Sequence, residues 1–291
     1  MPSLKEIRNR ITSVGSTMQI TSAMKMVSAA KLKRAQDAIT QMRPYSEKLQ
    51  EILSNLSATL DLSENAFSDT REVKNVLIVG ITSNRGLCGG FNNNVIKRVT
   101  HLVNEEYKDA NPRVLCLGKK MRDSYKRSDA YFINDALAPV EDIFNALNFE
   151  NTTAIANELM RMFTAKEFDK VVVVYNRFVN AATQDVRTEQ YLPIVPTVQA
   201  DNSSAGDYIF EPSKLEIVAD LIPKSLKIQL FKGLLDSNAA EHGARMTAMH
   251  KATDNASELQ KSLKLSYNKA RQAAITNEIL EIVGGAEALN S

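Results

Sequence analysis

A glycine-containing loop is the first feature of this sequence that could do chemistry. The segment SNRGLCGGF places Gly86, Gly89 and Gly90 between a buried strand pattern and a helix pattern, where dinucleotide-binding folds hold phosphate. The spacing differs from G-x-G-x-x-G, and no Gly-Lys-Ser/Thr follows to make a P-loop. The second strand pattern ends in Gly118-Lys119, where an acidic ribose ligand would be needed. We therefore interpret the glycines as residues that permit a tight turn with positive φ, and we expect no bound nucleotide or other cofactor.

The other chemically capable residues are few. Glu241-His242 is a possible acid/base pair, but no third group accompanies it, and we expect solvated helix surface there. Cys88 and Cys116 lack the paired spacing of a zinc site or a disulfide framework. We interpret Cys88 as a small apolar filler and Cys116 as a buried strand residue. With three histidines and no HExxH motif, the sequence predicts no catalytic residue and no metal site.

Composition narrows the class of protein further. The 291 residues are 44% hydrophobic and 24% charged, which excludes collagen-like, disulfide-scaffold and wholly disordered chains. No uncharged apolar stretch reaches the roughly 18 residues of a membrane-spanning helix. Residues 1–50 carry nine Lys/Arg against three Asp/Glu, without the interleaved aromatics that stack on bases. We expect no nucleic-acid binding; the basic end either faces an acidic partner or is a solvated helix face.

The N-terminal region has the pattern of a long helix. Ser3 and Glu6 form a capping box, and apolar residues then recur at alternating steps of 3 and 4. We expect Pro44 to bend the helix without ending it. The first 36 residues also have the basic, acid-poor look of a transit peptide, but the apolar repeat continues well beyond them. The expected seam is Leu4, Ile7, Ile11, Val14, Met18, then a phase slip through Ile20, Met24 and Val27, then Ala35, Ile39, Met42, Tyr45, Leu49, Ile52, Leu56 and Leu60.

The C-terminal region repeats this pattern. Pro212 is placed to open a helix, and Pro223 to kink or restart it. The expected seam is Met249, Ala252, Ala256, Leu259, Leu263, Ser266, Ala270 and Ala273. A second apolar row at a shifted phase contains Ile275, Ile279 and Ile282. A period near 3.5 predicts that the two terminal helices pair as an antiparallel coiled coil.

The region between the helices alternates strand and helix patterns. Strands are expected at 75–82, 113–117, 131–133 and 170–178, helices at 91–109, 119–127 and 150–165, and an antiparallel partner strand at 184–193. Unbroken apolar strands alternating with helices predict a mostly parallel sheet covered on both faces. Residues 61–72 and 199–211 have the composition of linkers or mobile loops. The fold class is α/β, with coiled-coil helices at 1–60 and 212–291 around a Rossmann-like module at 73–195.

Four segments resemble the gamma subunit of F-type ATP synthase, of the bacterial type. They are RNRITSVGSTMQITSAMKMVSAAKLKRAQ, ITSNRGLCGGFNNN, EHGARMTAMHKATDNA and YNKARQAAITNEILEIVGGAEAL, in this order along nearly the whole chain. The last segment is similar to the family signature at Ile275, Thr276, Glu278, Glu281, Gly285, Ala286 and Ala288. The cysteine-bearing insert of chloroplast gamma subunits is absent.

The resemblance implies a rotor and not a catalyst. In this family the coiled coil turns inside a ring of alpha and beta subunits, whose beta subunits hold the catalytic sites. The module lies beside an epsilon subunit and a membrane ring of c subunits driven by protons or sodium ions. The resemblance further implies a peripheral protein at the cytoplasmic face of the bacterial inner membrane. It implies ring contacts for Arg245, Gln272 and Thr276 and a contact with a beta subunit for Met24; we add Glu278 and the row Ile275, Ile279 and Ile282 as partner contacts.

Two other classes of protein stay open from the residues alone. A nucleotide-dependent α/β enzyme with helical arms would bind a cofactor as an isolated chain. A coiled-coil scaffold or holdase would bind unrelated clients and would not associate with ATPase subunits.

Overall fold

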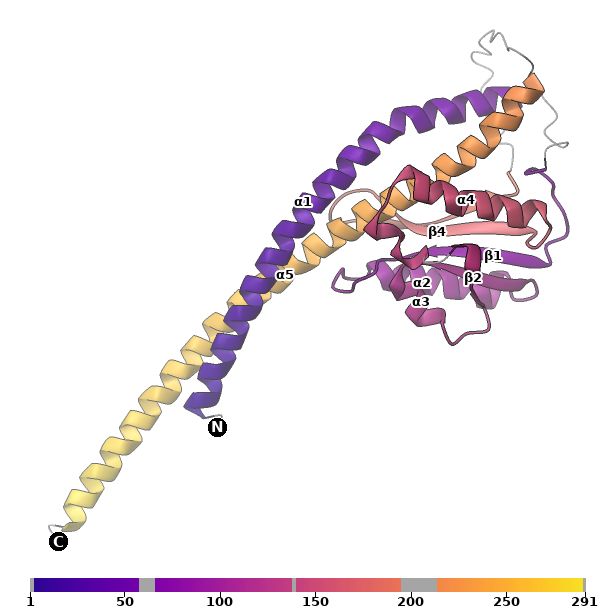
Figure 1. Ribbon diagram of the computed structural model, residues 1–291. Helices are drawn as coiled ribbons and strands as arrows, with labels where there is room; N and C mark the ends of the chain where they lie inside the picture. The colour runs from indigo at the N-terminus through magenta and orange to yellow at the C-terminus, as the bar shows by residue number, and fades with distance from the viewer. Residues whose placement is uncertain (1–2, 58–65, 138–139, 195–213, 290–291) are drawn as a thin grey trace. The chain divides into compact units, whose positions relative to one another are not determined.

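The computed structural model describes residues 3–57, 66–137, 140–194 and 214–289 (Figure 1). The chain divides into two compact units. One combines Met1–Ser28 with Met246–Ser291, and the other is Ala29–Arg245. The longest helices, α1 (Leu4–Ser57) and α5 (Lys214–Leu289), each contribute to both units. We call Ala29–Arg245 the sheet unit and the other the helical unit.

A five-stranded sheet forms the centre of the sheet unit. Its strands are β1 (Asn75–Ile81), β2 (Asn111–Leu117), β3 (Tyr131–Phe132), β4 (Lys170–Phe178) and β5 (Gln184–Leu192), in the order β3-β2-β1-β4-β5. All neighbours are parallel except β4 and β5, which are antiparallel. The predicted α/β class, the strands and the single antiparallel partner are confirmed.

Helices cover both faces of this sheet. They are α2 (Phe91–His101), which continues into one π-helical turn (Leu102–Glu106), α3 (Lys119–Tyr125) and α4 (Phe149–Thr164). Short 3-10 turns at Asp135–Leu137 and Val140–Asn145 precede α4. In Figure 1, α4 lies on one side of the strands and α2 and α3 lie on the other.

Alternation along the strands creates two apolar cores, because successive side chains point to opposite faces. On one face, Ile78 and Val174 pack with Val95 and Val99 of α2 and with Met121 of α3. On the other face, side chains of β1, β2 and β4 pack with α4 and with the first part of α5. Members of this second core include Leu77, Val79, Leu115, Val173, Leu159, Phe163, Leu226, Leu230 and Leu234.

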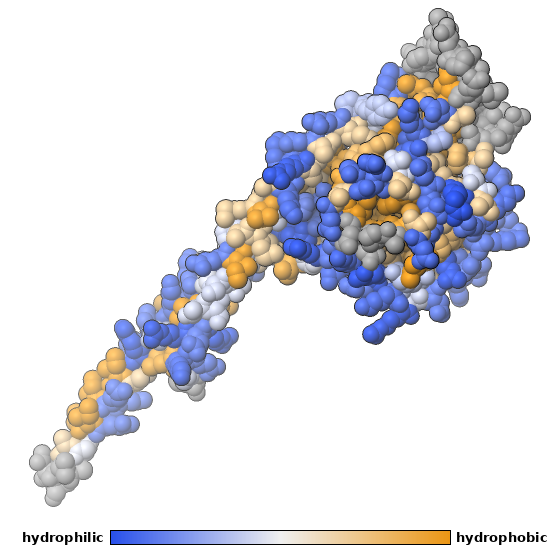
Figure 2. Space-filling model, viewed as in Figure 1, coloured by the Kyte–Doolittle hydropathy of each residue, from blue (hydrophilic) through white to orange (hydrophobic). Residues whose placement is uncertain are grey.

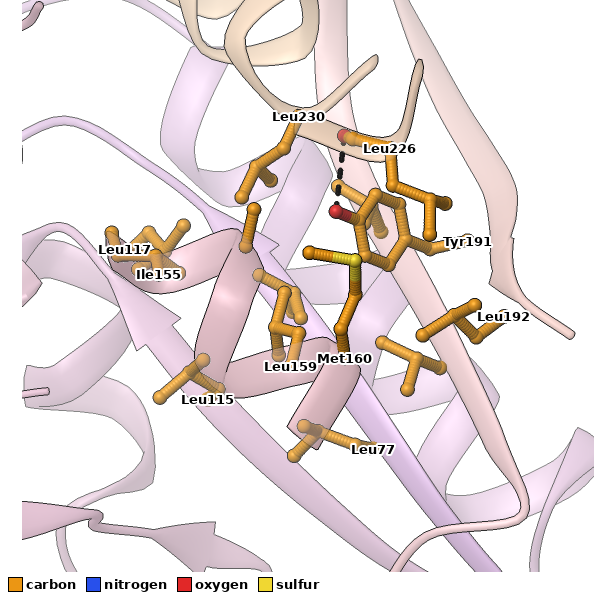
Figure 3. Close-up of a cluster of buried hydrophobic side chains, with 14 of the residues drawn as sticks. Leu77, Leu115, Leu117, Ile155, Leu159, Met160, Tyr191, Leu192, Leu226 and Leu230 are labelled. Atoms are coloured by element: carbon orange, nitrogen blue, oxygen red, sulfur yellow. Dashed lines mark hydrogen bonds between the residues drawn. The ribbon is translucent and has the colours of Figure 1, made fainter. Parts of the chain in front are cut away.

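Tyr191 ties α5 into that second core. Its ring is fully buried, and its hydroxyl donates a hydrogen bond to the backbone carbonyl of Leu226 at 3.0 Å (Figure 3). The ring packs among Met160, Leu192 and Leu230. The N-terminal part of α5 is therefore a component of the sheet unit's core.

Both long helices run through the prolines that the sequence marks. α1 continues past Pro44 and is curved in its second half (Figure 1), as predicted. α5 continues past Pro223, so no new helix starts there. The Ser3 hydroxyl accepts a hydrogen bond from the Glu6 backbone N–H at 3.2 Å, which is one half of the predicted capping box. Pro212 and Leu60 lie outside the described residues.

The buried stripe of α1 differs from the prediction in its middle. Leu4, Ile7, Ile11, Val14 and Met18 are buried or half-buried, as predicted. The stripe then continues without a phase slip, because polar and small side chains occupy its next positions. These are Thr21, Lys25 and Ser28, followed by Leu32, Ala35, Ile39, Met42, Ser46 and Leu49, whereas Ile20, Val27 and Tyr45 are exposed.

Polar pairs join the two helices within the helical unit. Thr253 Oγ1 lies 2.8 Å from Thr21 Oγ1, and Lys25 Nζ lies 3.5 Å from His250 Nδ1. Rising residue numbers in α1 pair with falling numbers in α5, so the predicted antiparallel arrangement is confirmed. The Gly15 Cα approaches so closely that an added Cβ would meet Gln260 Nε2 at 3.0 Å.

The predicted seam of α5 is correct at five of its eight positions. Met249, Ala252, Ala256, Leu263 and Ala270 are buried or half-buried. Leu259, Ser266 and Ala273 are exposed; the half-buried positions are one residue later, at Gln260, Tyr267 and Ala274. Because polar Gln260 and aromatic Tyr267 lie in the buried stripe, an aliphatic pattern places these seam positions one residue too early.

The predicted loop at 61–72 is fixed at its described end. The Arg71 guanidinium donates to Asp169 Oδ1 at 2.6 Å and to the carbonyls of Phe163 and Phe168. Asp169 also accepts from the backbone N–H groups of Lys74 and Asn75, at 3.0 and 2.8 Å. These contacts lead the chain into β1, so this end is anchored and not a free linker. The linker expected at 199–211 lies outside the described residues.

Candidate partner-binding surfaces

The loop after β1 has one glycine in the conformation expected of it. Gly89 has φ +60°, whereas Gly86 and Gly90 do not have positive φ. Leu87, a non-glycine residue, has φ 62°, and its side chain is largely exposed. A leucine in this region of φ stores strain, so surrounding contacts must hold the loop in place.

Side chains of the chain itself bond backbone N–H groups at the end of β1 and at the start of α3. Asn92 Oδ1 accepts from the Ser83 backbone N–H at 2.9 Å. At the start of α3, Asn84 Oδ1 accepts from the Lys119 N–H at 3.0 Å, and Thr82 Oγ1 accepts from the Met121 N–H at 2.9 Å. The N–H groups of Ser83 at the end of β1, and of Lys119 and Met121 at the start of α3, are thus already bonded within the chain. This geometry favours the interpretation of the glycines as turn residues.

Glu241 and His242 are not solvated surface, and that prediction is wrong. Glu241 is buried, and its carboxylate accepts a hydrogen bond from Arg245 Nη1 at 2.5 Å. Burial raises the pKa of Glu241, against the opposing effect of the Arg245 charge. Burial, together with the charges of Arg245 and Lys31, lowers the pKa of His242 to about 4. His242 is therefore neutral at pH 7.

Arg245 is buried and bonded within the chain. Its Nη2 donates to the carbonyls of Arg85 and Gly86, at 3.2 and 3.3 Å, in the loop after β1. Only 8% of the residue is exposed. Arg245 is thus not a solvent-exposed helix residue, and its contact with a ring of partners stays a prediction.

The two cysteines are buried and free. Cys88 Sγ lies 3.2 Å from Asn92 Nδ2, and it packs with Phe91, Ala240 and Ala244. Burial raises the pKa of the Cys88 thiol. Cys116 lies in β2 and packs on the α2 side of the sheet. Both placements agree with the sequence interpretation.

The second apolar row of α5 is exposed, in contrast to the seam before it. Ile275, Ile279 and Ile282 are 48%, 54% and 71% exposed. Leu280 and Val283, which the sequence reasoning left out, are exposed beside them. Figure 2 shows apolar residues following the C-terminal end of α5. Apolar side chains gathered on one helix without partners of their own chain are typical of a protein-binding surface.

The remaining predicted contact residues are accessible to a partner. Gln272, Thr276 and Glu278 are exposed, and Met24 is half-buried. Ile20, Met26 and Val27 form a second exposed apolar group, on α1. The apolar pattern of the sequence includes Ile20 and Val27. Polar Thr21 and Ser28 occupy the buried positions next to them, and a regular 3-4 spacing through these two polar residues indicates that Ile20 and Val27 face outward.

Two other kinds of site are absent from the part of the chain that the structure describes. Within residues 3–57, 66–137, 140–194 and 214–289, no three His, Cys, Asp or Glu side chains are grouped so that they could hold a metal ion. Among those same residues, no helix combines the length and the apolar character needed to cross a membrane.

Comparison with known proteins agrees over the full length of the chain. A family model described as ATP synthase matches residues 3–289. The ATP synthase gamma chains of Christiangramia forsetii and Flavobacterium johnsoniae are each 62% identical over 291 residues, covering 100% of both chains. The chain therefore belongs to the ATP synthase gamma chain family.

Solved structures share the fold. A chain of the Euglena gracilis mitochondrial ATP synthase has a TM-score of 0.65 at 22% identity, covering 98% of this chain and 94% of that one. A chain of the central stalk and c-ring structure of the Tetrahymena thermophila mitochondrial ATP synthase has a TM-score of 0.57 at 25% identity. It covers 80% of this chain and 99% of its own length.

Proposed function

We propose that this chain is the rotating central-stalk subunit of an F-type ATP synthase. The observation that carries the proposal is its 62% identity to ATP synthase gamma chains over the full length of both chains. The chain is a non-catalytic subunit: it couples the flow of protons or sodium ions through a membrane ring of c subunits to ATP synthesis or hydrolysis on the beta subunits.

The partners and the location follow from that role. The coiled coil of residues 1–60 and 212–291 contacts the alpha and beta subunits, and the module at 73–195 lies beside the epsilon subunit and the c-ring. The protein is peripheral at the cytoplasmic face of the bacterial inner membrane, without inserting into it. Met24, Gln272, Thr276 and Glu278 are its proposed polar and adaptable contacts, and all four are at least partly exposed.

The exposed apolar row supports this proposal physically. A rotor must present different surfaces to three chemically identical catalytic sites, because only differential contacts can give these sites different affinities. Ile275, Ile279 and Ile282 offer an apolar band on a single helix, which suits a surrounding collar from the alpha and beta subunits. The local excess of basic residues in 1–50 favours acidic loops of the beta subunits.

Affinity purification of the native protein under mild conditions tests the proposal. We expect alpha, beta, epsilon and c subunits to co-purify in fixed stoichiometry. Unrelated clients without ATPase subunits would contradict it and would favour a scaffold or holdase.

Titration calorimetry of the isolated chain with Mg-ATP tests the non-catalytic role. We expect no tight binding, because the sequence has no P-loop motif and because Asn92 and Asn84 accept hydrogen bonds from the N–H groups of Ser83 and Lys119. Stoichiometric ATP binding would instead support a nucleotide-dependent enzyme.

A further inference from the structure

Where α5 meets the loop after β1, the helix is built from small residues. Ala239, Ala240 and Ala244 are buried there, and Ala240 and Ala244 pack with Cys88, Phe91 and Phe178. A Cβ added to Gly243 would lie 3.2 Å from the Cα of Ala181, in the turn between β4 and β5. The helix backbone therefore lies close against two loops at the same edge of the sheet.

One buried ion pair completes this junction. Arg245 uses one guanidinium nitrogen for Glu241 and the other for the carbonyls of Arg85 and Gly86. Both side chains are buried, so these charge-assisted hydrogen bonds are formed away from water. The carbonyl of Arg85 also accepts from Ser83 Oγ at 2.6 Å, which links the guanidinium to the rest of the loop.

The junction lies at the boundary between the two units. Arg245 is the last residue of α5 in the sheet unit, and Met246 is the first in the helical unit. The loop that Arg245 holds contains Leu87 with its positive φ, a conformation that persists only under external constraint.

We propose that Arg245 is a positioning residue that, with Glu241, clamps α5 to the loop at 83–90 at the point where the helix leaves the sheet unit. The clamp stands on this chain's own contacts; its consequence for rotation rests on the proposed function. As the anchored root of the coiled coil, the clamp passes torque from the module to the helix. An Arg245 variant then loses coupling between ion flow and ATP chemistry because α5 is no longer held against the loop. The loss of a direct contact between Arg245 and a surrounding subunit is not required.

The reactivity of Cys88 reports on the clamp in the isolated full-length chain. Cys88 is 1% exposed and belongs to the clamped loop, so a maleimide reaches it only when the loop opens. With Cys116→Val as background, we expect Arg245→Ala to raise the labelling rate about tenfold or more, the effect of losing hydrogen bonds to a charged group. Arg271→Ala, at an exposed position on the same helix, is the control and should leave the rate unchanged.

A clamp needs the bonds from Arg245 to the loop carbonyls, whereas a simple ion pair needs only the opposite charges of Arg245 and Glu241. A conservative variant and an exchange of the two residues distinguish these cases. Arg245→Lys should restore part of the protection, because an ammonium group reaches only one side of the junction. Exchanging the two residues (E241R with R245E) should not restore it, because a carboxylate at 245 would face two carbonyl acceptors. A wild-type labelling rate in Arg245→Ala, or full protection in the exchanged pair, would overturn the proposal.

Folding and function are measured alongside. Far-UV circular dichroism must match wild type; if Arg245→Ala fails this test, Arg245→Gln repeats the labelling experiment. In the assembled enzyme, we expect Arg245→Ala to retain ATP hydrolysis and to lose ion pumping. A chain with an intact clamp that binds no ATPase subunits would refute the proposed function and leave the clamp standing.

Discussion

Two stretches of the single helix α5 have opposite environments. Between residues 222 and 245, the side chains of Leu226, Leu230 and Leu234 are buried in the core that α5 shares with the sheet. From 275 to 286, every side chain is exposed, although this stretch is also rich in isoleucine. The two stretches have a similar apolar composition, so composition does not decide whether a stretch is buried. The first stretch is buried because it packs against the sheet of the same chain. The second stretch has no such sheet beside it and is exposed, and we propose that another chain covers it.

The largest effect is expected from removing the apolar side chains of the second stretch, residues 275–286. Replacing Ile275, Ile279 and Ile282 together by serine should remove about 1.5 kcal/mol or more of burial for each residue within the complex. The variant should fold and assemble, but it should dissociate from alpha and beta subunits at lower salt and turn over more slowly. Subunit stoichiometry after a salt series and the ATPase rate measure this.

A matched control uses exposed polar positions of the same helix. The triple serine variant of Glu258, Lys261 and Lys264 should dissociate as wild type does. If the isoleucine variant instead unfolded as an isolated chain, the row would belong to the chain's own seam and the comparison would fail.

The next largest effect is expected from a cavity in the first stretch, residues 222–245. Leu230→Ala should lower the free energy of unfolding of the isolated chain by about 2–5 kcal/mol, because it leaves a cavity in the core beside Tyr191. Ile279→Ala should change it by less than about 0.5 kcal/mol, since that side chain has no buried contacts to lose. Urea denaturation of both variants gives the difference, and equal losses would contradict the division of α5 into two environments.

A smaller effect concerns the hydrogen bond that holds α5 to β5. Tyr191→Phe removes the donor to the Leu226 carbonyl and keeps the ring, so we expect a loss of about 1 kcal/mol in unfolding free energy. Tyr45→Phe, at an exposed position of α1, is the control and should be neutral. Chemical denaturation monitored by circular dichroism suffices; a neutral Tyr191→Phe would show that packing alone fixes α5 here.

A further effect is a pH dependence at the end of the first stretch. Burial holds the pKa of His242 at about 4, below its ordinary value of about 6.5, so the unfolded chain takes up a proton that the folded chain does not. This contribution to stability is complete above pH 6.5 and is lost as the pH falls towards 4. His242→Gln should lack that part of the pH dependence.

Unfolding free energies of both proteins between pH 4 and 7 measure the His242 contribution as a difference. Taking the difference also removes the opposite slope from Glu241, whose raised pKa favours the folded chain at low pH. Parallel curves for the two proteins would mean that His242 is solvated, as the sequence suggested.

The sheet could be predicted from the sequence because its strands are continuous apolar runs between glycine and polar punctuation. The stripe of α1 could not be followed past Met18, since polar Thr21 and Lys25 occupy seam positions while Ile20 and Val27 face outward. An aliphatic pattern indicates a helix, but it cannot tell an internal seam from a surface that a partner covers.

The candidate contacts show the same limit. The shifted phase of Ile275, Ile279 and Ile282 is visible in the sequence, and the three side chains are exposed, while their contact with a partner stays a prediction. The burial of Glu241 could not be predicted from the sequence. It depends on Arg245, which bonds to the carbonyls of Arg85 and Gly86, about 160 residues earlier in the chain. Backbone acceptors in an irregular loop leave no side-chain pattern for a sequence to display.

The paired threonines of the helical unit bear on sliding between α1 and α5. In a seam of identical leucines, moving one helix by a heptad recreates the same contacts, and the pair can slip along its axis. Here such a step would place Thr21 opposite Met246 or Gln260 in place of Thr253, and the paired hydroxyls would separate. The polar seam buries less apolar surface than a leucine seam would. In exchange, its paired hydroxyls favour one axial alignment of the two helices. A helix pair aligned in this way resists sliding along its axis.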